Sequence, residues 1–200
     1  MTELTRILLA SASPRRLELL RSLGFEVTVA PSGYHEPPIP HLSPRELAIS
    51  HAREKLASVA RVADAATVAA DTVVDLDGEA LGKPRDAADA IRMLEALSGR
   101  EHLVHTAYAV ALPGIDAPLE EAETTRVRFH DLSAAEIAEY VATGEPMDKA
   151  GAYGIQGRAA ALVAGIDGDF YTVMGLPLGG FVRSLRRSGF VPPTANRAAK

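Results

Sequence analysis

The sequence predicts a mixed α/β fold, and three observations support this prediction. Short apolar runs alternate with segments whose apolar residues recur at helical spacing, a pattern typical of α/β proteins. Capping and turn residues mark the boundaries between these segments. Of the 200 residues, 47% are hydrophobic and 24% are charged, which is the balance of an ordinary globular domain. We therefore expect a single domain over residues 1–190 and a flexible tail over 191–200.

The expected strands and helices alternate along the chain. Strands are predicted over 6–10, 25–29, 67–70, 102–112, 124–129, 160–164 and 170–173. Helices are predicted over 14–23, 44–59, 86–97, 134–143 and about 177–187. Two stretches are expected to be loops, namely 31–40, which holds four prolines, and 148–157, which is rich in glycine.

Capping residues justify the elements of the first half. Ser13-Pro14 places a serine at the N-cap and a proline at the first helical position, and Gly24 can close that helix in the left-handed conformation. The motif Ser43-Pro44-Arg45-Glu46 has the spacing of a capping box, so a helix begins there. The run 67–70 is short and apolar, and we expect this strand to end at Asp71.

Turn signals justify the elements of the second half. Asp77-Gly78 lies between two apolar runs and predicts a hairpin, and Pro113-Gly114 separates the two longer strands. Asp86 is the expected cap of the next helix, and Ser133-Ala134-Ala135-Glu136 is a second capping box. The last two strands are expected to pair across Asp167-Gly168.

Composition excludes several classes of function. The formal net charge of −5 argues against broad nucleic-acid binding, which needs clustered positive charge. The chain has no cysteine, so disulfides, zinc knuckles and iron–sulfur clusters are excluded. Its six histidines show no metal-ligand spacing, and no stretch approaches the roughly 20 apolar residues of a membrane span. These features predict a cytoplasmic protein without nucleic-acid or membrane partners.

The first candidate site is Ser11-Ala12-Ser13-Pro14-Arg15-Arg16. A strand that leads into a helix N-terminus presents free N–H groups and the positive end of the helix dipole to an anion. Two serines and two arginines add donors that suit phosphate oxygens. The alternative is a well-capped helix with solvated arginines.

Asp71 and the residues Lys55, Glu36 and Lys83 form a second group of candidates. A carboxylate after an apolar strand can hold Mg²⁺, orient a water or simply cap the next turn. Lys55 borders the apolar face of its helix, where a snorkelling side chain is the simpler explanation. Glu36 and Lys83, like the further candidates Asp148 and Lys149, are otherwise expected to be solvated surface residues.

The third candidate is the glycine-rich stretch 151–157. Three glycines in seven positions allow a ligand to approach the backbone closely, and Gln156 offers both a donor and an acceptor. The stretch lacks the ending of a P-loop and is not a dinucleotide-binding fingerprint. A glycine-rich hinge is the alternative interpretation.

Taken together, six blocks of sequence resemble the Maf family of nucleoside triphosphate pyrophosphatases, from residue 7 to about 190. The blocks are Leu-Ala-Ser-Ala-Ser-Pro-Arg-Arg at 9–16, Arg-Glu-Lys at 53–55, Ala-Asp-Thr at 70–72, Gly-Lys-Pro-Arg-Asp at 82–86, Asp-Lys-Ala-Gly-Ala-Tyr-Gly-Ile-Gln-Gly at 148–157 and Gly-Leu-Pro-Leu at 175–178. The resemblance implies a mixed sheet with flanking helices, like that of the inosine triphosphate pyrophosphatases, in two lobes around a central cleft. It implies hydrolysis of a nucleoside triphosphate between the α and β phosphates, which releases pyrophosphate.

The resemblance also implies a set of site residues. Asp71 matches the catalytic proton acceptor of the family. The positions that line its phosphate and metal site match Ser11, Arg15, Arg16, Glu36, Lys55 and Lys83. A divalent cation is the expected cofactor, magnesium or else manganese or cobalt, with Glu36 and Asp71 as its ligands. His35 departs from the family pattern, because relatives usually carry an acid there.

Three positions distinguish the subfamilies that this sequence resembles. Members that act on dTTP and UTP have Arg, Thr and Gln where this chain has Arg15, Thr72 and Gln156, whereas 7-methyl-GTP pyrophosphatases have Trp, Gln and Glu. The resemblance therefore predicts a dTTP/UTP pyrophosphatase with a small-molecule nucleotide as its partner, and it suggests a homodimer. The alternatives are 7-methyl-GTP hydrolysis, or a nucleotide-binding regulator of septum formation with little turnover.

Overall fold

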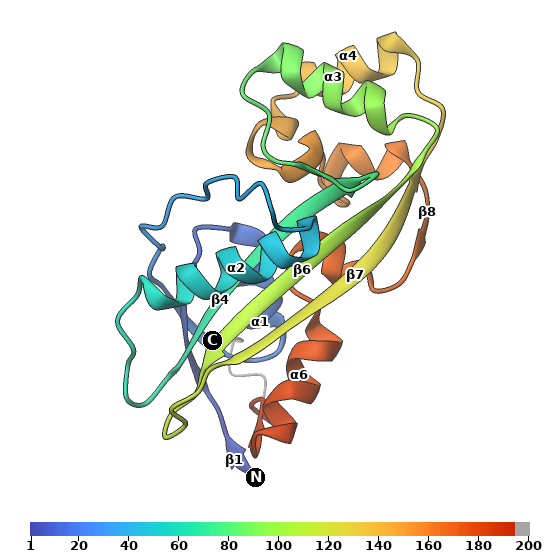
Figure 1. The fold of residues 1–200 in the computed structure, drawn as a ribbon. Helices are drawn as coiled ribbons and strands as arrows, with labels where there is room; N and C mark the ends of the chain where they lie inside the picture. The colour runs from blue at the N-terminus through green and yellow to red at the C-terminus, as the bar shows by residue number, and fades with distance from the viewer. Residues whose placement is uncertain (195–200) are drawn as a thin grey trace.

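Three long antiparallel strands, β4, β6 and β7, form the centre of the molecule (Figure 1). The computed structural model describes residues 1–194. The strands are β1 (Thr2–Glu3), β2 (Arg6–Leu9), β3 (Glu26–Val29), β4 (Ala66–Leu76), β5 (Glu79–Leu81), β6 (Glu101–Ala111), β7 (Leu119–Phe129), β8 (Val163–Asp167) and β9 (Phe190–Val191). The α-helices are α1 (Pro14–Ser22), α2 (Pro44–Ala57), α3 (Ala87–Leu97), α4 (Ala134–Ala142), α5 (Phe170–Met174) and α6 (Leu178–Arg187). Three 3₁₀ helices are η1 (Glu145–Asp148), η2 (Ala150–Ala152) and η3 (Gly157–Leu162).

Within the described residues, the main sheet has seven strands, in the order β3-β2-β4-β6-β7-β8, with β5 paired to β4. β2 runs parallel to the first part of β4, and their pairing ends with Leu9 opposite Val68. β6 pairs antiparallel with β4 from Thr67 to Asp75. β5 pairs with β4 only from Val74 onward, so between these two partners the edge of β4 has no strand beside it in the described chain.

Side chains alternate along β4, so adjacent residues face opposite sides of the sheet. Ala69 and Val73 pack in an apolar cluster with α2, and Asp71 shares this face. Ala70 packs in the core beneath α1 and α6, and Thr72 shares that opposite face. Figure 1 shows α2 lying across β4 and β6.

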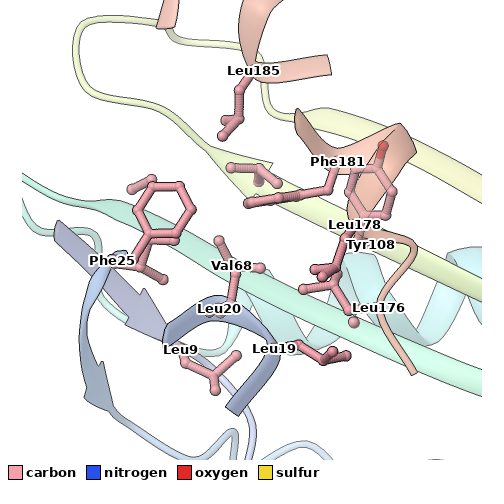
Figure 2. Close-up of a cluster of buried hydrophobic side chains, with 14 of the residues drawn as sticks. Leu9, Leu19, Leu20, Phe25, Val68, Tyr108, Leu176, Leu178, Phe181 and Leu185 are labelled. Atoms are coloured by element: carbon pink, nitrogen blue, oxygen red, sulfur yellow. The ribbon is translucent and has the colours of Figure 1, made fainter. Parts of the chain in front are cut away.

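Two apolar cores lie toward opposite ends of the long strands. The first core joins α1, β2, β4 and α6 and includes Leu20, Phe25 and Phe181 (Figure 2). The second core joins α3 and α4 to the other end of the sheet and includes Leu94 and Ile137. Burying one such side chain fully is worth about 1.5–3 kcal/mol, so each end has its own source of stability.

The predicted caps and the hairpin turn are confirmed. Ser43 and Ser133 each accept a hydrogen bond from the N–H of the glutamate three positions on, and that glutamate accepts one from the serine N–H. Asp86 caps α3 by accepting from the N–H of Asp89. Asp77-Gly78 joins β4 to β5 with φ angles of 56° and 88°, as a tight hairpin turn requires.

Several of the predicted boundaries are wrong. Residues 160–162 lie in η3 rather than in the predicted strand 160–164, and β7 begins at Leu119 rather than at Thr124, because its pairing with β6 extends that far. β4 does not end at Asp71 but continues to Leu76, because antiparallel pairing with β6 holds the extended backbone well past the end of β2. Asp71 therefore lies in the middle of its strand. Residues 170–173 belong to a helix rather than a strand, because Asp169 caps this turn by accepting from the N–H of Thr172. β8 pairs with β7 instead.

The two ends of the described chain lie together. β1 pairs in parallel with β9, whose last residue is Val191. The predicted flexible tail began at residue 191, and its last six positions, 195–200, lie outside the described residues. Among the residues described, no helix is both long enough and apolar enough to cross a bilayer.

Candidate active site

A cavity of about 610 Å³ lies at the edge of β4 that has no strand beside it. Its lining comes from both ends of the sheet: the β2–α1 turn, the loop before α2, α2 itself, β4, β5 and the segment around 148–155. Eight of the predicted site residues line it: Ser11, Arg15, Arg16, Glu36, Lys55, Asp71, Thr72 and Lys83. Segments that are far apart in the sequence thus meet in one cavity.

Lys55 joins the two predicted acidic residues. Its side chain projects from α2 and is buried, with 7% of the residue exposed. The ammonium donates to Oδ1 of Asp71 at 2.6 Å and lies 2.5 Å from Oε1 of Glu36. Removing a charged group from water costs several kcal/mol, so such a cluster is retained only where its members compensate one another or serve a function. The snorkelling interpretation of Lys55 is wrong.

The surroundings shift the pKa values of Asp71 and Glu36 in opposite directions. Burial raises the pKa of Asp71, which is 5% exposed, although the charge of Lys55 opposes this shift. Partial burial acts to raise the pKa of Glu36 as well, but the hydrogen bond and charge of Lys55, with a further contribution from Lys83, leave the Glu36 pKa below its ordinary value. Carboxylates whose pKa values are pushed apart are typical of acid–base sites. Asp71 is therefore the better proton acceptor of the two.

Arg16 is fixed by contacts with three segments of the chain. Its Nε donates to the carbonyl of Gly175 at 2.9 Å, its Nη1 to Oγ of Ser11 at 3.1 Å, and its Nη2 to Oγ1 of Thr72 at 3.1 Å. The guanidinium thus lines the cavity in one defined orientation. Because Thr72 faces away from α2, Arg16 and Lys55 approach the cavity from opposite faces of the sheet.

The start of α1 lies on the same wall of the cavity. Ser13 occupies the predicted N-cap position, and Pro14 follows it. Unlike Ser43 and Ser133, Ser13 makes no side-chain capping bond within the described chain. The first-turn N–H groups therefore remain suited to an anion, and the cavity receives the positive end of this helix.

The remaining cations lie nearer the surface. Lys83 is exposed and lines the cavity after β5. Arg15 lies across the cavity from Asp148, with 4.0 Å between Nη1 and the Oδ2 carboxylate oxygen. Together with Arg16 and Lys55 they make the cavity locally cationic, although the whole chain carries a net charge of −5.

Gln156 is not brought into the cavity. Its side chain is exposed, whereas the preceding Gly154 and Ile155 line the cavity. The glycines nearby serve packing within the chain: a Cβ on Gly151 would meet Val74 at 2.9 Å, and φ there is +65°. The structure thus gives these glycines a packing role and shows no ligand contact for Gln156.

Several cavity residues were not among the predicted site residues. Tyr34 and His51 line it, with 3.2 Å between the tyrosine hydroxyl and Nδ1 of the histidine. His51 precedes Lys55 by one helical turn, and this spacing was the available signal. Tyr153 lines it from the 148–155 segment. Lys149 of the same segment, for which a solvated surface position was the simpler expectation, also lines the cavity and is partly buried.

The donor set restricts what metal the site can hold. Within the described residues, no group of three or more His, Cys, Asp or Glu side chains is placed to bind a metal ion. Glu36 and Asp71 supply two carboxylates, both in contact with Lys55, and His35 does not line the cavity. Mg²⁺ commonly takes one or two carboxylates together with water and substrate phosphates. The residues therefore fit a cation that shares its ligands with a phosphorylated substrate.

The cavity on this mixed α/β sheet combines several cations and a helix N-terminus with a buried carboxylate. This combination is typical of proteins that bind phosphorylated ligands. The particular family follows from the sequence: the chain belongs to the Maf-like protein family, whose sequence profile matches residues 6–188.

Relatives resemble this chain over nearly their whole length. A dTTP/UTP pyrophosphatase of Geobacter metallireducens is 50% identical over 190 residues, covering 94% of this chain and 99% of the relative. A dTTP/UTP pyrophosphatase of Geobacter sulfurreducens is 53% identical, covering 92% and 97%. Among solved structures, a HAM1 protein from Coxiella burnetii is 19% identical with a TM-score of 0.48, covering 92% of this chain and all of that one.

Proposed function

We propose that this protein is a dTTP/UTP pyrophosphatase, which hydrolyses the bond between the α and β phosphates and releases the nucleoside monophosphate and pyrophosphate. The observation that carries the proposal is the buried Lys55–Asp71 pair inside the cationic cavity. The full-length similarity to relatives of that name supports the choice of substrate.

Asp71 acts on water in this proposal. Its carboxylate accepts a proton from a water molecule as the water oxygen bonds to the α phosphorus, and the bond from phosphorus to the bridging oxygen breaks. The electron pair of that bond leaves with pyrophosphate. Burial supports this role, because a raised pKa makes Asp71 a stronger base than an ordinary aspartate. Lys55 holds the carboxylate in place through its 2.6 Å hydrogen bond.

The cations and the helix N-terminus bind the phosphates. Arg15, Arg16 and Lys83 line the cavity, and guanidinium groups match phosphate oxygens with paired donors. Phosphate-transfer catalysis depends mainly on positioning and on stabilising charge, so side chains held in place before binding are favoured. Arg16, with its three contacts, is the best example in this site.

We propose a divalent cation as cofactor, magnesium or else manganese or cobalt, with Glu36 and Asp71 as the protein ligands. When bound, it would neutralise phosphate charge and lower the pKa of a coordinated water. Dialysis against a chelator should abolish hydrolysis, and added Mg²⁺ should restore it. Full activity after chelation would remove the cation from the proposal.

Arg15, Thr72 and Gln156 are the proposed determinants of substrate choice. Pyrophosphate release from UTP, dTTP, CTP, GTP, ATP and 7-methyl-GTP tests the whole assignment. We expect UTP and dTTP to be the best substrates. Preference for 7-methyl-GTP would assign the chain to the 7-methyl-GTP pyrophosphatases instead. Binding of UTP without release of pyrophosphate would favour a nucleotide-binding regulator.

The proposed place of action is the cytoplasm, where nucleoside triphosphates are available, and the proposed assembly is a homodimer. Light scattering on the purified chain tests the assembly. A mass of one chain at micromolar concentration would contradict it.

A further inference from the structure

We propose that Thr106, which does not line the cavity, is a positioning residue that fixes Arg16 through the hydroxyl of Thr72. The inference rests on the proposed function, since it concerns how the same cavity binds phosphate. It also implies that the hydroxyl proton of Thr72 does not contact the nucleotide base.

Three hydrogen bonds connect Arg16, by way of β4 and β6, to α5 along one face of the sheet. Nη2 of Arg16 donates to Oγ1 of Thr72 at 3.1 Å. The hydroxyls of Thr72 and Thr106 lie 2.9 Å apart, and the Thr106 hydroxyl donates to the carbonyl of Thr172 at 2.6 Å. Thr106 and Thr172 are both fully buried. The series thus joins α1, β4, β6 and α5, four elements that are distant in the sequence.

The direction of every bond in this series is determined. A backbone carbonyl only accepts, so the single hydroxyl proton of Thr106 is used on Thr172. The Thr106 oxygen must then accept the proton of the Thr72 hydroxyl. A guanidinium only donates, so Arg16 takes a lone pair of the Thr72 oxygen. The Thr72 hydroxyl therefore has no proton left for a nucleotide base.

Arg16 keeps two N–H groups with which it can bind a ligand. A guanidinium has five N–H groups, and contacts within the described chain use one on each of its three nitrogens. One N–H remains on Nη1 and one on Nη2. Both can donate charge-assisted hydrogen bonds to phosphate oxygens. Their direction depends on the Thr72 contact, and through it on Thr106.

Thr125 provides a matched control. It is also fully buried on a strand of the same sheet, and its hydroxyl also donates to a backbone carbonyl, that of Asp169, at 2.9 Å. It does not line the cavity. Replacing either threonine with valine removes one buried hydroxyl and its bond to a backbone carbonyl, so both variants should lose stability; Thr106→Val should lose more, because the Thr72 hydroxyl also loses its acceptor. Only Thr106 is connected to Arg16.

The test compares Thr106→Val, Thr106→Ser and Thr125→Val by thermal unfolding, by calorimetric binding of inorganic pyrophosphate, and by kcat and KM for UTP. We expect both valine variants to melt at lower temperature. Only Thr106→Val should raise the pyrophosphate Kd and the KM for UTP, roughly 3- to 10-fold as for one lost hydrogen bond. Thr106→Ser, which keeps the hydroxyl, should restore both values.

A double variant shows whether the effect passes through Arg16. In an Arg16→Ala background, Thr106→Val should not weaken pyrophosphate binding further, because its target is already absent. An additive loss there, or a pyrophosphate Kd for Thr106→Val equal to that for Thr125→Val, would overturn the inference. If the wild type binds pyrophosphate but hydrolyses no nucleotide, the proposed function fails while these Kd comparisons still decide the role of Thr106. If the wild type does not bind pyrophosphate, the proposal for Thr106 fails, whereas pyrophosphate release from UTP still decides the proposed function.

Discussion

On the wall of the cavity formed by α1, α2 and β4, charged side chains bond to residues that are distant in the sequence, whereas on the wall around 148–155 Lys149 bonds only to near neighbours. Lys55 of α2 bonds to Asp71 of β4, and Arg16 of α1 bonds to Thr72 of the same strand. On the other wall, Lys149 donates to the carbonyl of Glu145 and to its neighbour Asp148.

This difference indicates a division of labour. A wall whose side chains already have defined orientations favours catalysis, because few groups have to reorient when the transition state forms. A wall built from local turns can accommodate a base without disturbing that arrangement. We therefore expect changes to the first wall to reduce turnover strongly, and changes to the second to alter substrate preference with smaller losses.

The largest effect is expected for Asp71→Asn. Asparagine keeps the volume and an oxygen that can accept from Lys55, but it cannot take a proton from water, so turnover should fall by about 10²- to 10⁴-fold or more. UTP binding measured by calorimetry should survive. Asp75→Asn, on the same strand but outside the cavity lining, is the control and should stay active. Near-normal turnover in Asp71→Asn would remove this residue from the mechanism.

Arg16→Ala and Lys83→Ala should each lower kcat/KM for UTP by roughly 10- to 150-fold, because each loses a charge-assisted contact worth about 1.5–3 kcal/mol. They should differ in stability. Arg16 bonds to Ser11, Thr72 and Gly175, so its removal should lower the melting temperature. Lys83 is exposed, so its removal should not. Equal melting temperatures of the two variants would contradict the expectation that the contacts of Arg16 stabilise the fold and that Lys83 does not.

The pH dependence of kcat/KM tests Asp71 on the same wall, and the expected effect is smaller than that of the substitutions. Burial raises the pKa of Asp71, so the folded protein takes up this proton at higher pH than an ordinary aspartate would. Below that pKa the base is lost, and kcat/KM should fall about tenfold per pH unit. Lys55 opposes the shift, so Lys55→Met should move the acid limb to higher pH. A limb at or below about pH 3.9 in folded protein would contradict the role of burial.

The sequence predicts features set by neighbouring residues better than features set by contacts between segments that are distant in the sequence. The serine caps at 43 and 133 and the hairpin at 77–78 depend on near neighbours, and all form as expected. The length of β4 depends on β6, which is distant in the sequence, so its end at Asp71 was wrongly placed. Residues 170–173 have a strand-like composition, but one cap from Asp169 makes them helical.

The candidate site shows the same limit. Residue types and spacing indicated an anion site at 11–16, but Lys55 read as a surface side chain, since nothing local reveals its bond to Asp71. Only the resemblance to the family placed Lys55, Glu36 and Asp71 together. Neither approach pointed to Thr106, because a buried threonine on a strand resembles an ordinary core residue.

The smallest effect on rate is expected for Gln156, which follows the last lining residue of the second wall. Uracil and thymine present an N–H donor between two carbonyl acceptors, and an amide can pair with a donor and an acceptor at once. Gln156→Glu keeps an acceptor and loses the donor. kcat/KM for UTP and dTTP should therefore fall roughly 3- to 10-fold, as for one neutral hydrogen bond, while the Kd for inorganic pyrophosphate stays unchanged.

Because Gln156 is exposed and lies outside the cavity lining, its contact with a base requires the segment 154–157 to move toward the nucleotide. The measurement is kcat/KM for UTP, dTTP, CTP and ATP in the wild type and in Gln156→Glu. The thymine methyl is worth only about 0.8 kcal/mol of burial, so UTP and dTTP should remain close in both proteins. Adenine inverts the donor pattern and should be rejected strongly by the wild type. If Gln156→Glu loses as much activity with ATP as with UTP, the residue supports the fold of its segment and does not read the base.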